Sequence, residues 1–330
     1  MPDSAGSEIY LSDLSARDEP WDRNRASAST VQTLYEGTEH HRLHERMMEC
    51  AQLLEFGTAT DSEGEKRLHL TGSRFCRVRH CPTCQWRRSL MWTARALQGM
   101  PRIESDYPKA RWIFITLTVK NCPVSELRQT VQKMNKAFKR LSERAKWPCL
   151  GWAKSLEVTR NPKTGEAHPH FHILGMVKPS YFTYGYIKQA DWRELWRDCL
   201  RVDYLPVVNV KTVKPKKLAD GSVPTNTDAI RETFKYTVKP DDLTADREWL
   251  LELTDQLHNS RAIAIGGVLR TYWKANEPED LINTDEDGSV ELDDVEYYML
   301  FGWREKAKRY AYMNRRTKID ATQNDASKNE

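Results

Sequence analysis

Three histidines at alternate positions, His168, His170 and His172, introduce an apolar run in the stretch EAHPHFHILG. Residues two apart on a β-strand point to the same face, so His170 and His172 can converge on one cation. Glu157, in the preceding run SLEVT, reaches that face if the two runs form a hairpin. Two imidazoles and a carboxylate leave coordination positions open for a substrate oxygen, as in catalytic metal sites. We therefore predict a divalent metal site formed by Glu157, His170 and His172.

The remaining histidine of the motif, His168, precedes Pro169 and is expected at the entrance of the strand. His168 is the less favoured metal ligand. Its alternative role is to contact one of the metal-binding side chains or a DNA phosphate. The alternative interpretation of the motif is that its histidines cap a turn or pack at a sheet edge. Strict alternation beside a carboxylate favours metal, and the mixed ligand set suits Mn²⁺ or Mg²⁺ when a substrate phosphate completes the shell.

A second chemically capable group lies in RETFKYTVK, where Glu232 and Tyr236 are four residues apart and Lys239 follows. On a helix these positions share a face. Taken alone, the pattern favours an ordinary solvated face with a Glu–Lys pair. A phenol with a pKa of about 10 is a poor nucleophile near neutral pH. A phosphate whose negative charge is neutralised by a bound metal is easier for such a weak nucleophile to attack. The metal site therefore makes Tyr236, Glu232 and Lys239 catalytic candidates.

The chain has seven cysteines, an odd number, and no recognisable export signal, which favours a reducing cytoplasm over disulfides. Three of them form a C-x4-C-x2-C motif: Cys76, Cys81 and Cys84. A structural zinc site requires a fourth ligand. Cys50, after a predicted short helix, is the preferred one, with His44 and His80 as alternatives. The competing hypothesis is a reduced, partly buried cysteine cluster without metal.

Basic residues occur in two segments that could contact DNA. One set surrounds the cysteine motif, with tryptophans interleaved: Arg77, Arg79, Arg87 and Arg88. The other follows a predicted strand: Lys211, Lys214, Lys216 and Lys217. Such residues suit phosphate contacts and base stacking, although basic runs are often simply solvated. The net charge of +4 permits nucleic-acid binding without arguing for it.

The elements that must position these residues follow from periodicity. Residues 111–213 predict the order strand, helix, strand, strand, helix, strand, with NPKTGEA as a hairpin turn. This is the ferredoxin-like order, so we expect an α+β fold whose central antiparallel sheet carries helices on one face. The other face would be free for a site.

The predicted domain organisation divides the chain into five parts. They are a disordered tail (1–35), a cysteine-rich zinc and DNA-binding module (36–105), the sheet domain with the metal site (106–245), a helical C-terminal part (246–312) and a second disordered tail (313–330). The longest apolar runs are too short to cross a bilayer, so we expect a cytoplasmic protein without membrane contact.

Four motifs in this order resemble the HUH endonucleases, and most closely the single-tyrosine replication initiators of rolling-circle plasmids. They are FCRxRxCPxCQxRR at 75–88, FxTLTVxN at 114–121, PHFH at 169–172 and ExxxY at 232–236. The matched motifs cover about residues 45–245, and Cys50 also resembles a cysteine at this place in the family. The HUH endonuclease fold is the fold that the resemblance implies for the central domain.

The resemblance also implies a mechanism. Tyr236 would attack a phosphodiester at the plasmid's double-strand origin, form a 5′-phosphotyrosyl link and free a 3′-OH that primes synthesis. His170, His172 and Glu157 would hold the divalent ion, and Glu232 would activate water at termination. Origin DNA is the implied partner, together with a host helicase and polymerase. The alternatives are an HUH transposase or relaxase, or a non-catalytic zinc protein that binds nucleic acid.

Overall fold

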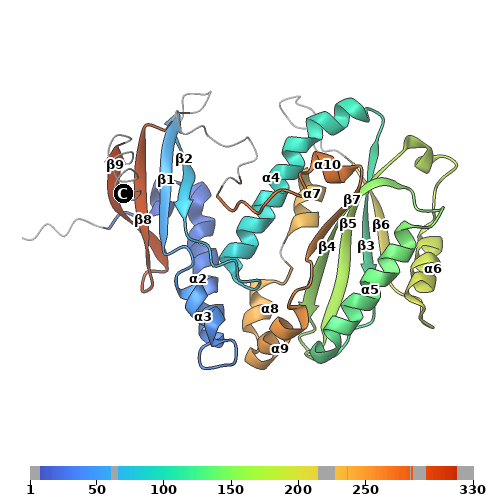
Figure 1. Ribbon diagram of the computed structural model, residues 1–330, viewed down its shortest axis with the longest axis horizontal. Coiled ribbons are helices and arrows are strands. Elements are labelled where there is room, and N and C mark those ends of the chain that lie inside the picture. Colours follow the sequence, from blue (N-terminus) through green and yellow to red (C-terminus); the bar gives the residue numbers. More distant parts are fainter. Residues whose placement is uncertain are drawn as a thin grey trace, which may run out of the picture. The chain divides into compact units, whose positions relative to one another are not determined.

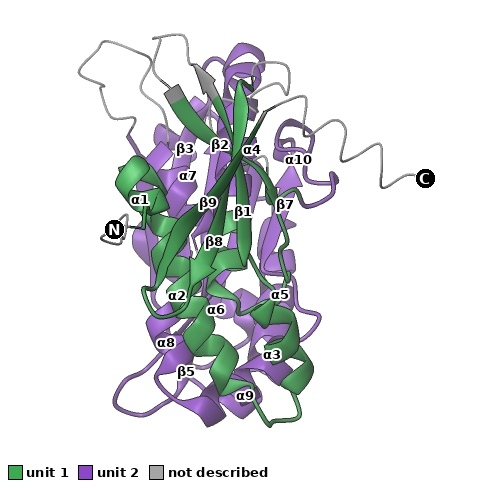
Figure 2. Cartoon of the chain, turned by 90° about the vertical axis from the view of Figure 1, so that its left-hand side faces the viewer, with its two compact units in different colours: residues 1–88, 280–330 green, residues 89–279 purple. Residues whose placement is uncertain are grey.

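The structure is a computed structural model that describes residues 8–60, 66–214, 227–235, 237–282, 284 and 295–317. The chain divides into two compact units, one formed by residues 1–88 with 280–330 and the other by residues 89–279 (Figure 2). Each unit has its own antiparallel sheet. The predicted α+β class is confirmed, whereas the predicted five-part division is replaced by two units.

The second unit is built on a five-stranded sheet. Its strands are β3 (Arg111–Thr118), β4 (Cys149–Arg160), β5 (Ala167–Val177), β6 (Val208–Val213) and β7 (Ile263–Gly267). They lie in the order β6-β3-β5-β4-β7, and each neighbouring pair is antiparallel. With α5 (Leu127–Ser142) and α6 (Gln189–Leu200), the first four strands have the element order predicted for residues 111–213. That prediction is confirmed.

Helices cover both faces of this sheet, which corrects the prediction of helices on one face. On one side Phe171 of β5 packs against Phe138 of α5, with ring centroids 6.2 Å apart. On the other side Leu174 and Trp112 pack in one apolar cluster with residues of α4 (Pro82–Asp106) and α7 (Thr227–Phe234). Figure 1 shows α4 and α7 on the side of the sheet opposite α5 and α6. The reason is that the central strands are apolar on both faces and must bury both.

The remaining elements of the second unit are short. They are η2 (Val124–Glu126), η3 (Pro179–Phe182), α8 (Pro240–Thr244), α9 (Arg247–Leu257) and α10 (Leu269–Tyr272). β7 lies in the stretch after residue 246 for which helix was predicted, and it extends the sheet at the β4 edge. A short run such as AIAIGG cannot be assigned by period alone, and pairing with β4 decides it.

The first unit has a four-stranded sheet whose order is β2-β1-β8-β9. The strands are β1 (Leu53–Thr60), β2 (Lys66–Ser73), β8 (Tyr297–Arg304) and β9 (Arg309–Thr317). The predicted helical C-terminal part is therefore wrong for residues 297–312, and the predicted tail is wrong for 313–317, because these residues form a hairpin. Pairing of β8 with β1 joins residues more than 200 positions apart, which local periodicity does not reveal.

The N-terminal segment is ordered where it is described, which corrects the predicted disordered tail. It forms α1 (Leu11–Leu14), η1 (Ala16–Asp18) and α2 (Glu19–Leu34), followed by α3 (His41–Met48). Trp21 of α2 is 2 % exposed and lies edge-on to Phe56 of β1 and Tyr310 of β9, with ring centroids 6.2 and 6.4 Å away. Although the segment is polar in composition, one side of α2 is buried and packs against the core of the first unit.

Among the described helices, none combines the length and apolarity needed to cross a bilayer.

Candidate functional site

The β4–β5 hairpin sets the register of the predicted metal ligands. Its turn is closed by the amide of Gly165, which donates to the carbonyl oxygen of Asn161 at 2.8 Å, and Gly165 has a φ of +72° that favours glycine. The register that follows pairs Glu157 with His170. Because His170 and His172 are two apart on β5, all three side chains reach the same face of the sheet. The hairpin predicted from the sequence is confirmed.

The three side chains converge on one point. Glu157 Oε2 lies 3.2 Å from His170 Nε2 and 2.8 Å from His172 Nε2. Their ligand atoms all lie within 4.8 Å of one another. Glu157 is 3 % exposed and both histidines are at the border of burial, at 9 % and 7 %. The group can therefore hold a metal ion, with the side away from the sheet left for further ligands.

Hydrogen bonds at the other ring nitrogen orient both imidazoles. His170 Nδ1 lies 3.2 Å from the carbonyl oxygen of His168, and His172 Nδ1 lies 3.5 Å from Thr116 Oγ1. Nε2 of each ring can donate to Glu157. When the proton lies on Nδ1 and is donated to these oxygens, the Nε2 lone pair can instead bind a cation. These hydrogen bonds at Nδ1 favour a metal site over the alternative that the two histidines only pack at a sheet edge.

His168 lies beside the ligand group rather than in it. Its Nδ1 is 2.8 Å from Asn121 Oδ1, and its ring centroid is 5.3 Å from that of His170. Burial, together with repulsion from His170, lowers the pKa of His168. An imidazole that is anchored to Asn121 is suited to a contact at the rim of the site.

Glu157 is ionised despite its burial. Burial alone would raise the pKa of Glu157, but hydrogen bonds from His170, His172 and Lys235 hold it far below its ordinary value. An ionised carboxylate with little exposure is what a divalent cation requires as a ligand.

Lys235 was not predicted as a site residue, and it contacts the ligand group directly. Its Nζ lies 2.9 Å from Glu157 Oε2 and 2.6 Å from Glu232 Oε1. Burial alone would lower the pKa of Lys235, but the two carboxylates raise it above its ordinary value. Lys235 lies off the helix face, from Glu232 to Tyr236 and Lys239, on which the prediction was based. The only available signal was the position of Lys235 next to Tyr236.

The helix predicted to carry Glu232, Tyr236 and Lys239 on one face ends earlier than expected. α7 ends at Phe234, so Lys239 lies beyond it, exposed and directly before α8. Glu232 is exposed in the last turn of α7 and pairs with Lys235. The shared helix face is therefore wrong for Glu232 and Lys239. Tyr236 itself lies outside the described residues.

The chain on both sides of position 236 contacts β4 beside the ligand group. On one side Lys235 reaches Glu157, and on the other the amide of Val158 donates to the carbonyl oxygen of Thr237 at 2.8 Å. These two contacts join Lys235 and Thr237 to the neighbouring strand residues Glu157 and Val158.

The four predicted zinc ligands come together in the first unit. The sulfur of Cys50 lies 3.7 Å from that of Cys81 and 3.6 Å from that of Cys84, and the sulfurs of Cys76 and Cys84 are 3.6 Å apart. Four sulfurs around a tetrahedral zinc with Zn–S bonds of about 2.3 Å are about 3.8 Å apart. The four cysteines are buried and form one potential metal-binding group, with Cys50 as its fourth member.

The two alternative ligands lie outside that group. His44 Nδ1 is 3.1 Å from the carbonyl oxygen of Gln32. His80 is fully buried, and burial lowers its pKa to about 3. Burial also raises the pKa of the Cys81 thiol, so four thiolates in this place need a cation among them.

The predicted DNA-binding arginines differ in exposure. Arg87 is buried: its Nε and Nη2 each donate at 2.8 Å to the carbonyl oxygens of Leu281 and Ile282, and its guanidinium lies over Trp21. Arg87 therefore stabilises the first unit, and its burial argues against the predicted DNA contact. The reason is that a guanidinium fork suits buried carbonyls as well as phosphates.

The other three arginines near the cysteines remain at or near the surface. Arg77 is exposed, and Arg88 donates to its carbonyl oxygen at 3.0 Å. Arg79 is only partly exposed, and burial, reinforced by Arg88, lowers its pKa to about 10. Of the four, Arg77 is therefore the one whose side chain is clearly open to a phosphate.

The lysine segment begins on the face that carries the metal ligands. Lys211 of β6 is opposite Phe114 of β3, and Asn209 is opposite Thr116, which is itself opposite His172. Lys211 and Lys214 are exposed. Lys216 and Lys217 lie outside the described residues.

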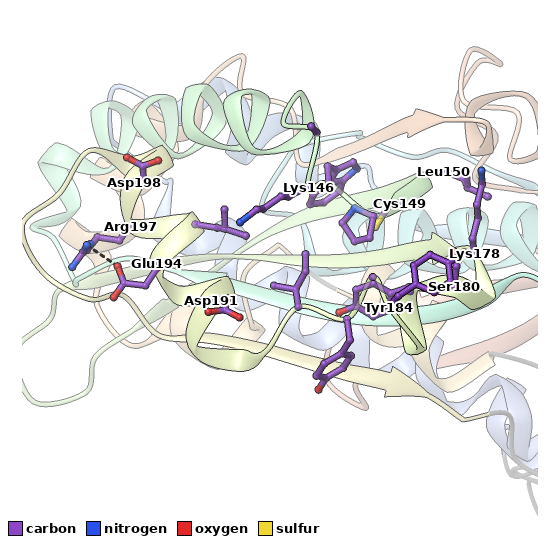
Figure 3. A pocket seen from close by; sticks show the side chains of 18 residues that line it. Lys146, Cys149, Leu150, Lys178, Ser180, Tyr184, Asp191, Glu194, Arg197 and Asp198 are labelled. Atoms are coloured by element: carbon purple, nitrogen blue, oxygen red, sulfur yellow. Dashed lines mark ion pairs between the residues drawn. The ribbon is translucent and has the colours of Figure 1, made fainter.

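A cavity of about 850 Å³ lies elsewhere in the second unit. Side chains around the start of β4, the end of β5 and α6 line it, and the Glu194–Arg197 ion pair of 2.6 Å lies at its side (Figure 3). Cys149 at its wall is eight residues before Glu157 on β4, so the two places are roughly 25 Å apart. Mixed charges line the cavity, and among the described residues the groups able to hold metal lie elsewhere.

Comparison with known proteins decides the family. The model of a family described as "Replication protein" matches residues 67–311. The chain belongs to this replication protein family. The resemblance to replication initiators is thereby confirmed, and the matched span contains both the cysteine motif and the metal-ligand strands.

Relatives of this replication protein extend over most of its length. It is 35 % identical to "Protein rep" of Lentilactobacillus hilgardii over 320 residues, which are 92 % of this chain and 99 % of that protein. It is 34 % identical to "Protein rep" of Streptococcus pneumoniae over 249 residues, 74 % of this chain and 75 % of that one. It is 36 % identical to "Protein rep" of Lactiplantibacillus plantarum over 264 residues, 73 % and 81 % of the two chains. No solved structure matches the chain.

Proposed function

We propose that this replication protein initiates rolling-circle replication of a plasmid by nicking one strand of the double-strand origin. The observation that carries the proposal is the convergence of Glu157, His170 and His172 on one face of the β4–β5 hairpin. A structural zinc site would be closed by four protein ligands, whereas three ligands leave room for a phosphate oxygen. Membership in a replication protein family makes DNA the substrate that fits this site. An HUH endonuclease fold is part of the same proposal, supported by the strand order and the motif resemblance.

The proposed reaction is a phosphoryl transfer to Tyr236. The phenol gives up its proton to water and its oxygen attacks the scissile phosphorus. The bond to the 3′ oxygen breaks, and the leaving oxygen takes up a proton to become the 3′-OH. The 5′ side remains linked to the protein as a phosphotyrosyl ester. A Mn²⁺ or Mg²⁺ ion held by Glu157, His170 and His172 would offset the charge of the phosphate and polarise it.

Two contacts support Tyr236 as the nucleophile. Lys235 binds Glu157, and the carbonyl oxygen of Thr237 accepts a hydrogen bond from the amide of Val158. The two residues that flank Tyr236 in the sequence thus contact the strand that carries a metal ligand. The proposal therefore needs no helix face shared with Lys239, which we retain only as an exposed cation within reach of the DNA backbone.

Glu232 is proposed to end the reaction by activating water against the phosphotyrosyl ester. Its carboxylate is exposed and linked through Lys235 to Glu157, so it lies one side chain away from the ligand group. A carboxylate at that place can accept a proton from an attacking water molecule. Hydrolysis then releases the protein without a second tyrosine.

Single-stranded DNA is proposed to follow the open part of the metal face. Phe114 is partly exposed, and its ring centroid is 5.4 Å from that of His172, so it offers a surface on which a base can stack. Asn209 and Lys211 of β6 continue this face and can contact phosphates. Lys214, Lys216, Lys217, Arg77, Arg79 and Arg88 are further proposed phosphate contacts.

The cysteine group is proposed to hold a structural Zn²⁺ that organises the first unit. The spacing of its sulfurs and their burial support a bound zinc over the alternative, a reduced cysteine cluster without metal. We further propose that the protein acts in the cytoplasm on plasmid origin DNA, together with a host helicase and polymerase. A transposase or relaxase would use the same metal and tyrosine, but relaxases place the tyrosine before the histidines, and here it follows them.

The test is covalent attachment. The purified protein is incubated with Mn²⁺ and a single-stranded oligonucleotide carrying the origin of the plasmid that encodes it, and the products are run on a denaturing gel. We expect a shifted band in the wild type and none in Tyr236→Phe, which should still bind the oligonucleotide. A matched control is Tyr186→Phe, an exposed tyrosine at the distant cavity. Attachment that persists in Tyr236→Phe would remove the nucleophile assignment, and binding without attachment in the wild type would favour the non-catalytic alternative.

A further inference from the structure

One carboxylate oxygen of the ligand group is shared by three donors. Glu157 Oε2 lies 3.2 Å from His170 Nε2, 2.8 Å from His172 Nε2 and 2.9 Å from Lys235 Nζ. The first two contacts come from the proposed ligands themselves. The third comes from an ammonium ion, which is not a metal ligand and carries the same sign of charge as a metal. Lys235 therefore takes up a position at the ligand oxygen that a cation would need.

A second anchor makes this position adjustable. Lys235 Nζ lies 2.6 Å from Glu232 Oε1, while Glu232 is exposed and Glu157 is buried. An ammonium that leaves Glu157 thus keeps a partner and does not become an unpaired charge. Its side chain is 29 % exposed, which gives it room to turn toward Glu232.

A divalent cation and an ammonium cannot both bind closely at Glu157 Oε2. Their charges repel, and the oxygen already accepts from two imidazoles. A metal bound by the Nε2 atoms of His170 and His172 would compensate the charge of Glu157 more fully than Lys235 does. The metal and Lys235 should therefore exclude one another at this oxygen.

We propose that Lys235 is a positioning residue whose ammonium group occupies Glu157 until a divalent ion displaces it onto Glu232. This inference rests on the proposed function only in that Glu157, His170 and His172 bind the ion. Because Lys235 is directly followed by Tyr236 in the chain, ion binding then changes an anchor of the segment that carries the proposed nucleophile. Ion binding and the position of Lys235 are thermodynamically linked, and each affects the other by the same factor.

The first test measures how accessible the Lys235 amine is. The full-length protein, without DNA, is reductively methylated in the presence and absence of Mn²⁺, and modified lysines are quantified by mass spectrometry. We expect Mn²⁺ to increase methylation of Lys235 severalfold, because its ammonium leaves the buried carboxylate. Lys239, which is exposed, is the internal control and should not change. In His172→Ala, which lacks a proposed ligand, Mn²⁺ should leave Lys235 methylation unchanged.

The second test measures Mn²⁺ affinity by calorimetry in the wild type and four variants. Lys235→Met removes the competitor and should bind Mn²⁺ on the order of tenfold more tightly, because a charge-assisted hydrogen bond no longer has to be broken. Glu232→Gln removes the destination of the ammonium and should bind Mn²⁺ more weakly. The double variant should match Lys235→Met, because Glu232 acts through Lys235. Lys239→Met, the matched control for loss of one nearby positive charge, should stay within about twofold of the wild type.

The outcomes separate this inference from the proposed function. Wild-type Mn²⁺ affinity that is lost in His172→Ala but unchanged in Lys235→Met, with constant Lys235 methylation, would overturn the exchange and leave the metal site standing. Equal gains in affinity in Lys235→Met and Lys239→Met would also overturn it, because net charge alone would explain them. No Mn²⁺ binding by any of the proteins would overturn both the exchange and the proposed metal site.

Discussion

The two proposed metal sites differ in how they are built. The cysteine group has four buried sulfurs drawn from segments around residues 50 and 76–84, and it closes on itself. The Glu157–His170–His172 group sits on one hairpin, offers three ligand atoms and has an ammonium as its fourth neighbour. A closed set of soft ligands suits a metal that stabilises a fold, and an open set of mixed ligands suits one that meets a substrate. The number and type of ligands thus differ in the way that the two proposed roles require.

The largest expected effect tests the closed site. Cys81→Ser should abolish stoichiometric zinc and lower the free energy of unfolding of the first unit by more than about 3 kcal/mol, because binding energy at a structural site is folding energy. Elemental analysis and thermal melting measure the two quantities. Cys122→Ser, a buried cysteine outside the group, is the control. Unchanged zinc content in Cys81→Ser would mean that the sulfurs cluster without a metal. The contrast between a structural metal site and an open one would then be lost.

The next effect tests the open site. His172→Ala should weaken Mn²⁺ binding by more than about tenfold and remove DNA attachment, while zinc content stays at the wild-type value. His258→Ala changes an exposed histidine outside the group and serves as the control. If His172→Ala lost zinc as well, or melted as low as Cys81→Ser, the group would be structural and the contrast with the cysteines would disappear.

A pair of arginine variants sharpens the comparison near the cysteines. Arg87→Met should destabilise the protein by about 1–3 kcal/mol, because the carbonyl oxygens of Leu281 and Ile282 lose their donor. Arg77→Ala should leave stability unchanged, reduce DNA affinity severalfold and lower the slope of affinity against salt concentration by about one. Chemical unfolding and salt-dependent binding separate the two. The reverse result would mean that the buried arginine contacts DNA and the exposed one holds the fold.

The smallest effect concerns pH and the first unit. Burial alone would raise the pKa of Glu305, but hydrogen bonds from Lys308, Trp303 and Ser29 lower it to about 2 from 4.5. A carboxyl group whose pKa is lower in the folded than in the unfolded protein stabilises the fold, and this contribution is complete at pH values above the unfolded pKa. The contribution should therefore fade as the pH falls from about 4.5 toward 2. Because the carboxylate is more than half exposed, we expect only about 0.5–1 kcal/mol.

Melting of wild type and Glu305→Gln between pH 7 and 3 measures this contribution. The difference between the two proteins should be constant near neutral pH and shrink in acid. A difference that grows in acid would contradict the assigned direction. Because Glu305 links Ser29 of α2 to the β8–β9 hairpin, this measurement also reports on elements of the first unit that the sequence did not reveal.

Local patterns were sufficient where one strand or hairpin decides the geometry. Alternation placed His170 and His172 on one face, and hairpin parity brought Glu157 opposite His170. The C-x4-C-x2-C spacing gave three zinc candidates, and the family resemblance favoured Cys50. For the hairpin ligands and the three clustered cysteines the relevant distances follow from backbone periodicity or from a short loop, which sequence spacing encodes directly.

Tertiary structure decided the features that depend on distant partners. Pairing of β8 with β1 turned a predicted helix into a hairpin, and Trp21 became a core residue because Phe56 and Tyr310 surround it. Lys235 became a site residue because α7 ends at Phe234, where the chain leaves helical geometry and the lysine reaches Glu157.

The amino-acid sequence by itself determined which atoms could bind metal in this replication protein. They are one carboxylate and two imidazoles on a hairpin, and the four thiols of Cys50 and the C-x4-C-x2-C motif. Only the fold decided what surrounds them. It placed an ammonium at the Glu157 group and buried Arg87. The physical reason is that ligand spacing is a short-range property of the backbone, whereas burial and charge pairing are set by residues brought together from far along the chain.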